Sequence, residues 1–135
     1  MDPGCEKTLE ELKEYNIDAV KTFREQYIND GFMYNDCLFD SDDRARMNII
    51  GVATLALTQG EKGGMPVDFT WRDAKNVDRP MSGMDITKLG AALFTQVSLC
   101  YYVYRAHKAN IEAMNKIEDL IAYDCFANWP KIIVE

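Results

Sequence analysis

The residues that could carry out chemistry are few and lie far apart in the chain. His107 is the only histidine, which argues against most catalytic triads and against histidine-rich metal sites. Because it lies beside Arg105 and Lys108 on an expected helix, we interpret it as a surface or subunit-contact residue rather than as a general base. No enzyme motif is found, and we predict no catalytic residue, no metal ligand and no cofactor.

Aspartates at positions 36, 40, 42 and 43 form an acidic cluster that invites a calcium interpretation. An EF-hand loop alternates its oxygen ligands and needs a glycine at its sixth position and a glutamate at its twelfth. Here the intervening Cys37–Phe39 has the pattern of a strand, and no such glycine is present. We therefore interpret the cluster as a helix cap. The stretch 60–64, GEKGG, lacks the GxxxxGK[ST] pattern of a phosphate-binding loop.

Three aromatic side chains, Trp71, Tyr101 and Tyr102, could line a ligand groove. Aromatic residues at these spacings more often belong to a core or to a subunit interface. We favour the core or interface interpretation, and we keep a small-molecule or peptide-binding module built on the Trp71 hairpin as an alternative function.

The chain is organised around one long stretch, Asp85–Lys116, which predicts a helix. Between Leu89 and Tyr104 it contains no charged residue, and a helix that is apolar on most sides has to be buried on most sides. One small domain can hardly cover such a helix, so we expect part of it to meet another chain. A coiled-coil seam and a monomer core both fit the alternating three- and four-residue spacing of Leu89, Ala92, Gln96, Leu99, Val103, Ala106 and Asn110.

The remaining elements follow from capping and turn signals, and together they predict an α+β fold that is mostly α. It consists of an N-terminal helix, two short β-hairpins, a middle helix and the long apolar C-terminal helix. The first helix is expected over Glu6–Asn29, opened by a Thr8/Glu11 capping box, and it is followed by a hairpin over Phe32–Phe39 that turns at Asn35-Asp36. A middle helix capped by Asp40-Ser41 and a second hairpin over Val67–Met81, turning within Asp73–Asn76, come next. A Ser82/Asp85 capping box then begins the long helix, and a short final helix extends through Tyr123.

Three details of these helices are open to a direct structural check. Asn16 is a poor residue for a helix interior, so a break or kink there is expected. The middle helix is expected to bury Met47, Ile50, Ala53, Thr54 and Leu57. Gly51 lowers the stability of that helix, so we expect it to mark a close approach to another helix, against Gly90 or Ala91.

Composition narrows the class of protein. A chain of 135 residues is long enough for one domain with a single core. Its net charge of -7 and pI near 4.7 argue against a general nucleic-acid or anionic-membrane binder. The N-terminal residues lack the apolar core of a signal peptide. The four cysteines form no CxxC pair, so we interpret them as reduced thiols of a protein made in a cytoplasm.

The order of several short motifs resembles a known family. The matching residues are Arg24, Asn29-Asp30-Gly31-Phe32 with Tyr34, Phe39-Asp40-Ser41-Asp42, Asn48-Ile49 with Gly51 and Ala53, Phe69 with Trp71-Arg72 and Asn76, Arg105, Lys108 and Ile111, and the terminal Trp129-Pro130. The family is phage- or prophage-encoded and carries a C-terminal domain of unknown function, found in tail and tail-fibre-region proteins. The resemblance covers roughly residues 23–130 and divides the chain into an N-terminal arm with the first part of the first helix (1–22), a tail-type domain (23–130) and a C-terminal tail (131–135).

The resemblance implies a structural component of a bacteriophage tail that is made in the bacterial host cytoplasm and becomes part of the virion. The alternative that it leaves open is a tail-fibre assembly chaperone that is not retained in the virion. The implied partners are copies of the same chain, as a trimer or hexamer, and other tail or fibre proteins, with no nucleic acid and no membrane. The residues that we expect in these protein contacts are Leu89, Leu93, Gln96, Leu99, Tyr101, Val103, Trp129, Ile132 and Ile133.

Overall fold

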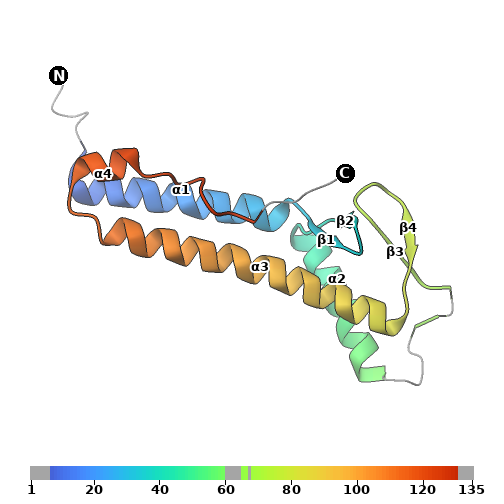
Figure 1. The fold of residues 1–135 in the computed structure, drawn as a ribbon. Helices are drawn as coiled ribbons and strands as arrows, with labels where there is room; N and C mark the ends of the chain where they lie inside the picture. The colour runs from blue at the N-terminus through green and yellow to red at the C-terminus, as the bar shows by residue number, and fades with distance from the viewer. Residues whose placement is uncertain (1–6, 60–64, 67, 131–135) are drawn as a thin grey trace. The chain divides into compact units, whose positions relative to one another are not determined.

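The computed structural model describes residues 7–59, 65–66 and 68–130. Over these residues the chain forms four helices and two separate two-stranded antiparallel sheets (Figure 1), which confirms the predicted α+β, mostly helical fold. None of the described helices is long and apolar enough to cross a membrane. The elements are α1 (Leu9–Asn29), β1 (Phe32–Tyr34), β2 (Cys37–Phe39), α2 (Asp43–Gln59), β3 (Thr70–Arg72), β4 (Asp78–Pro80), α3 (Gly83–Glu112) and α4 (Ile117–Ala122).

The chain packs as two compact units. Of the described residues, the first unit contains those from 7 to 27 and Leu99–Trp129, and the second contains those from 28 to 98 together with Pro130. The N-terminal part of α3 therefore belongs to the second unit and its C-terminal part to the first. The predicted tail residues 131–135, with Ile132 and Ile133, and the stretch 60–64 lie outside the described residues.

The predicted local signals that begin and turn the elements are present. Thr8 and Glu11 form a reciprocal capping box at the start of α1, and Ser82 and Asp85 form another at the start of α3. The first hairpin turns at Asn35 and Asp36, whose φ angles of 49° and 61° suit a two-residue turn between antiparallel strands.

The cap of α2 differs from the prediction. Asp42, rather than Asp40-Ser41, caps this helix by accepting a hydrogen bond from the Ala45 N–H at 3.0 Å. Ser41 is fully buried and instead holds the end of α1. Its hydroxyl accepts a hydrogen bond from the Gly31 N–H at 2.7 Å and donates one to the Ile28 carbonyl at 2.6 Å. Ser41 therefore bridges two backbone groups that the helix end leaves without partners.

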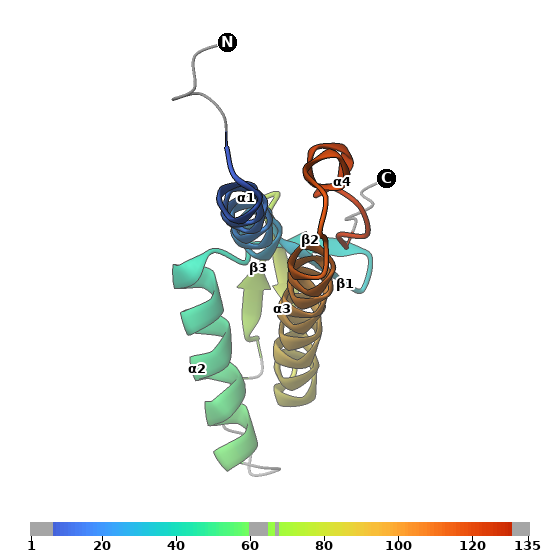
Figure 2. The ribbon, with the colours of Figure 1, turned by 90° about the vertical axis from the view of Figure 1, so that its left-hand side faces the viewer.

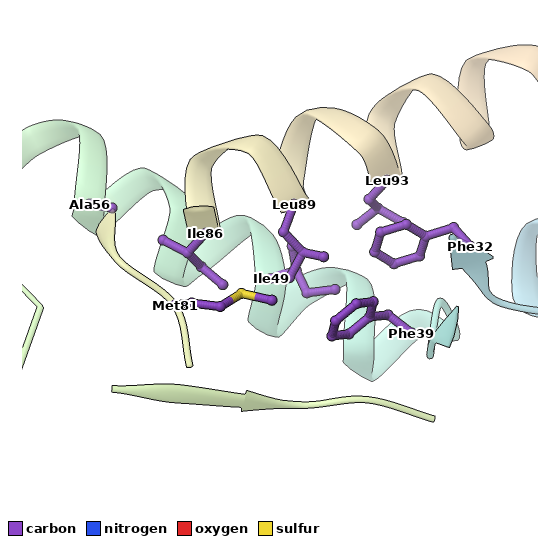
Figure 3. Packing of buried hydrophobic residues seen from close by; sticks show 8 residues of the cluster. All are labelled: Phe32, Phe39, Ile49, Ala56, Met81, Ile86, Leu89 and Leu93. Carbon is purple, nitrogen blue, oxygen red and sulfur yellow. The ribbon is translucent and has the colours of Figure 1, made fainter. Parts of the chain in front are cut away.

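The core of the second unit lies where α2, the N-terminal part of α3 and the first hairpin meet (Figure 3). Two aromatic rings from the hairpin, Phe32 and Phe39, pack together with a centroid distance of 5.9 Å. Their partners in this core are Ile49, Ala56, Met81, Ile86, Leu89 and Leu93. A backbone hydrogen bond also links the two hairpins: the Ala74 N–H donates to the Leu38 carbonyl at 2.8 Å.

The buried face of α2 differs from the predicted one, although Ala53 is buried as predicted. Ile49, Ala53 and Ala56 point into the core, whereas Met47, Ile50 and Leu57 are exposed. The choice is explained by a close approach between α2 and α3, since a Cβ atom added at Gly90 would lie 3.1 Å from the Cβ of Ala53. Glycine at position 90 therefore lets the two helices approach closely. Gly51 does not face Gly90 or Ala91, because a Cβ atom at Gly51 would meet nothing within 4 Å.

Replacing Gly51 by alanine is expected to stabilise the monomeric fold. The substitution adds a methyl group to open space, and it removes the conformational freedom that glycine gives the unfolded chain. We expect the free energy of unfolding to rise by about 0.5–1 kcal/mol. Urea denaturation of the dilute protein measures this change. Gly90→Ala is the matched control and should give no such gain, because its methyl group would press against Ala53.

A buried carboxylate organises the turn of the second hairpin. Asp73 is 3% exposed; one of its oxygens accepts hydrogen bonds from the Lys75 and Val77 N–H groups, at 2.9 and 3.0 Å. The other oxygen accepts a hydrogen bond from Arg79 Nε at 2.9 Å. The bond from Val77, followed by those from Arg79 and Lys75, lowers the pKa of Asp73 against the opposing effect of desolvation.

The lowered pKa predicts a loss of stability in acid. A carboxylate whose pKa is lower in the folded than in the unfolded chain stabilises the fold fully above its unfolded pKa, which is about 3.9. That stabilisation is lost as the pH falls through the folded pKa. The thermal midpoint should therefore depend on Asp73 above about pH 4 and progressively less below it. Comparing the wild type with Asp73→Asn across this pH range measures the effect.

A second carboxylate, Asp78, is paired with Arg72 at 2.9 Å and also has a lowered pKa. The comparison of the wild type with Asp73→Asn therefore needs a control. Asp78 is present in both proteins, so its contribution cancels in the difference except for the part by which the Asp73 charge raises the pKa of Asp78. Asp68→Asn, a change at an exposed carboxylate of the same unit, should leave the midpoint curve nearly unchanged. A wild-type advantage over Asp73→Asn that persists undiminished below pH 3 would contradict the role given to the Asp73 carboxylate.

The first unit is built from α1, the C-terminal part of α3, α4 and the segment that follows α4 (Figure 1). Helix α1 runs without the predicted break at Asn16. Asn16 is buried, and its Nδ2 donates a hydrogen bond to the Leu120 carbonyl at 2.9 Å. The polar side chain thus secures α4 rather than interrupting α1. The ring of Phe126 packs on Phe23 with a centroid distance of 4.1 Å.

Candidate protein-contact surfaces

The side of α2 that faces away from α3 is exposed, and from Met47 onward it carries no charge. We call this surface the α2 outer face, and it consists of Met47, Ile50, Gly51, Thr54, Leu55, Leu57 and Thr58. Met47 and Leu57 expose 72% and 67% of their surface. In Figure 2 none of the other described elements of the second unit lies on that side of α2. Exposed apolar side chains gathered on one helix face are typical of a protein-contact surface.

The predicted long C-terminal helix is present as α3, but it is not buried on most sides. In the second unit its buried stripe consists of Ile86, Leu89 and Leu93, while Phe94 is 72% exposed. In the first unit Cys100, Val103 and Tyr104 are buried, while Leu99 and Tyr102 are exposed. The described fold therefore leaves an open side on each part of α3, and this side is uncharged between Leu89 and Tyr104.

The predicted contact residues divide into buried and exposed groups. Leu89 and Leu93 belong to the core of the second unit, and Val103 and Trp129 are buried in the first, so these four cannot reach a partner; this corrects the prediction for them. Leu99 and Tyr101 are exposed and remain candidates. Gln96 is half-buried, and its buried Nε2 has no hydrogen-bond partner among the described residues.

Sequence reasoning did not include Phe94 among the contact residues, did not select Tyr102 over Tyr101, and expected Met47 and Leu57 to be buried, although all four side chains are largely exposed. A signal for Phe94 and Tyr102 exists, since neither falls on the stripe through Ile86, Leu93 and Cys100, which repeats every seven residues. For α2 the signal is the lack of any charged residue from Met47 to Gln59, which leaves an apolar outer face whichever side is buried.

His107 is buried rather than at the surface, which corrects the prediction. It is 3% exposed, and its Nδ1 lies 2.5 Å from the Tyr123 hydroxyl while its Nε2 lies 2.7 Å from the Ala127 carbonyl. Because a carbonyl oxygen only accepts, Nε2 carries the proton, and a neutral ring then accepts the Tyr123 O–H at Nδ1. With both ring nitrogens engaged, His107 fixes the segment after α4 and cannot reach a substrate.

An aromatic cluster surrounds His107 and Arg24 in the first unit. Trp129 stacks on Tyr27 with a centroid distance of 5.4 Å and also contacts the ring of His107. The Arg24 guanidinium lies over the rings of Tyr104 and Tyr101, at 4.5 and 4.9 Å from their centroids. Such cation–π contacts hold a charged group at an apolar surface. These residues act in packing, and Tyr101 thereby has a partner within the chain.

The remaining candidate residues of the sequence also have structural roles. Trp71 is half-buried, contacts the ring of Phe69 and packs against the core of the second unit. Asn76 has a φ of 63° in the turn between β3 and β4. Burial, followed by the charge of Asp124, raises the pKa of the Cys125 thiol, which lowers its fraction of reactive thiolate. The described residues contain no group of three or more histidine, cysteine or acidic side chains that could hold a metal ion.

Most of the chain matches one known family of protein domains. A family described as a domain of unknown function, DUF4376, matches residues 11–124. The chain belongs to this DUF4376 family. Neither the curated proteins nor the solved structures gave a match. In this member of the family, the matched range includes the α2 outer face and the exposed apolar residues of α3.

Proposed function

We propose that the protein is a structural component of a bacteriophage tail that acts through protein–protein contacts and not as an enzyme. The tail context rests on the resemblance of its motifs, from Arg24 to Trp129-Pro130, to tail and tail-fibre-region proteins. The observation that supports a contact role is the open, uncharged side of α3. Tyr102, which is 69% exposed, and Leu99 both lie within the stretch from Leu89 to Tyr104, which contains no charged residue.

The exposed side chains on α3 would stabilise a contact if a partner buried them. Burying an apolar side chain the size of leucine against a partner contributes about 1.5–3 kcal/mol relative to leaving it in water. Aromatic residues are enriched at the centres of protein interfaces. A partner helix or strand that covers Leu99 and Tyr102 would gain this energy without burying an unpaired charge. The proposed partners are copies of the chain or a neighbouring tail protein, in the virion.

A test of the tail role is the protein content of purified virions. A structural component stays in the virion after purification and should be found by mass spectrometry at a fixed ratio to the other tail proteins. If the protein is required for tail assembly but is absent from purified virions, the structural proposal is wrong. That result would favour the tail-fibre chaperone.

A matched pair of variants tests the contact role of α3. Leu99→Glu combined with Tyr102→Glu places charge on the exposed side of the helix, where folding should be preserved, and should reduce incorporation into tails. Ala109→Glu combined with Ala113→Glu places the same charge at two exposed positions beyond the uncharged stretch, and incorporation should be retained. Equal incorporation of both variants would contradict a contact through α3.

A further inference from the structure

We propose that the α2 outer face is a self-association surface that packs against the α2 outer face of a second copy in an antiparallel arrangement. Met47, Gly51, Thr54 and Thr58 follow one another at alternating four- and three-residue spacing, the spacing by which packed helices interlock. The larger side chains Ile50, Leu55 and Leu57 flank this line and are exposed. The centre of the face therefore carries small side chains, and its borders carry larger apolar ones.

Gly51 gives this face its close-packing point. A Cβ atom there would meet nothing within 4 Å, so the glycine serves no packing purpose within the described chain. Glycine in a helix interior reduces helix stability, and glycine on a helix surface allows a second helix backbone to approach closely. Gly90 shows this use within the chain, because it admits Ala53 of α2. Gly51 offers the same opening on the opposite side of α2.

Charge identifies the occupant as a second copy. The outer face is neutral from Met47 onward. Two exposed charged residues precede it: Asp43, which is paired with Arg46, and Arg44, which stands one turn before Met47 on the same line. The last turn of α2 contains no basic residue, although its backbone carbonyls carry the negative end of the helix dipole. In an antiparallel pair centred on Gly51, residue 44 of one copy lies level with residue 58 of the other. Each Arg44 then meets the carbonyl end of the partner helix.

The expected strength follows from the size of the face. A 17-residue helix is about 25 Å long, and two such helices bury an area at the small end of specific interfaces. We therefore expect a dissociation constant of about 10–1000 µM for the isolated contact. Where other contacts already hold two copies together, the high effective concentration would keep this weak contact formed. The inference does not depend on the tail context, although it adds a defined self-contact to the proposed function.

Sedimentation of the whole chain over a range of concentrations tests the proposal. The wild type should shift from monomer to dimer, and Met47→Glu should weaken the association by about tenfold or more, because the charge would enter an apolar contact. Asn48→Glu adds the same charge beside the face, at an exposed position on the same helix turn, and should leave the association nearly unchanged. A strictly monomeric wild type, or equal association of the two variants, would overturn the proposal.

Cross-linking identifies the pairing itself. In the antiparallel arrangement Gly51 lies next to Gly51 of the other copy, so a Gly51→Cys variant should form a disulfide between the two copies at this position, located by peptide mass spectrometry. Asn48→Cys is the matched control, and it should form little disulfide between the two copies. If copies associate but no 51–51 disulfide forms, the α2 pairing is wrong, whereas the tail role is still tested separately by the virion content.

Discussion

Replacing Leu89 by alanine is expected to lower the free energy of unfolding by about 2–5 kcal/mol. Leu89 is fully buried between Ile49 and Ile86 in the core of the second unit (Figure 3). The substitution removes buried apolar atoms and leaves a cavity, and the surrounding helices can close that cavity only in part. Urea denaturation followed by circular dichroism measures the loss.

The matched control for Leu89 is Leu99, which is on the same helix and is exposed. Leu99→Ala is expected to change the free energy of unfolding by less than about 1 kcal/mol. The two leucines would have similar effects if Leu89 were a contact residue held open for a partner, as the sequence alone suggests. Equal, small effects of the two substitutions would therefore contradict the core described for the second unit.

Replacing Ser41 by alanine is expected to lower the free energy of unfolding by about 2–4 kcal/mol, because two buried backbone groups lose their partner at once. The Gly31 N–H and the Ile28 carbonyl are both bonded to the Ser41 hydroxyl. Gly31 has a φ of 99° and a Cβ atom there would lie 2.9 Å from the Phe39 carbonyl oxygen, so the turn has little room to rearrange. Denaturant titration again gives the value.

Ser82→Ala serves as the control for Ser41. Ser82 caps α3 at an exposed site, where its hydroxyl accepts one hydrogen bond from the Asp85 N–H. Losing a single exposed cap costs about 1 kcal/mol. If Ser41→Ala costs no more than Ser82→Ala, the buried bridge between α1 and the segment after the first hairpin does not contribute as described.

The features that could be predicted from the sequence are those that depend on a few neighbouring residues. The capping boxes at Thr8 and Ser82 and the turn at Asn35-Asp36 each need only a short segment with suitable side chains. These features fix the order and type of the elements, and hence the fold class. The pairing of β3 with β4 was predictable for the same reason, because its turn lies close in sequence to both strands.

The features that could not be predicted depend on contacts between distant segments. Helix α2 is apolar on both sides, so periodicity alone does not select the buried one; the approach of Ala53 to Gly90 decides it. His107 follows a charged pattern, yet it is buried because the chain reverses after α3 and brings Tyr123 and Ala127 beside it. A single sequence holds no local signal for either event.

The proposed function requires this chain to bind copies of itself or other tail proteins, and its solution mass tests the self-binding part most directly. Size-exclusion chromatography coupled to light scattering, run at increasing protein concentrations, should give a mass that rises above that of the 15.4 kDa chain. Met47→Glu on α2, or Leu99→Glu combined with Tyr102→Glu on α3, should reduce this rise. A constant mass of one chain at every concentration would contradict self-association through either helix.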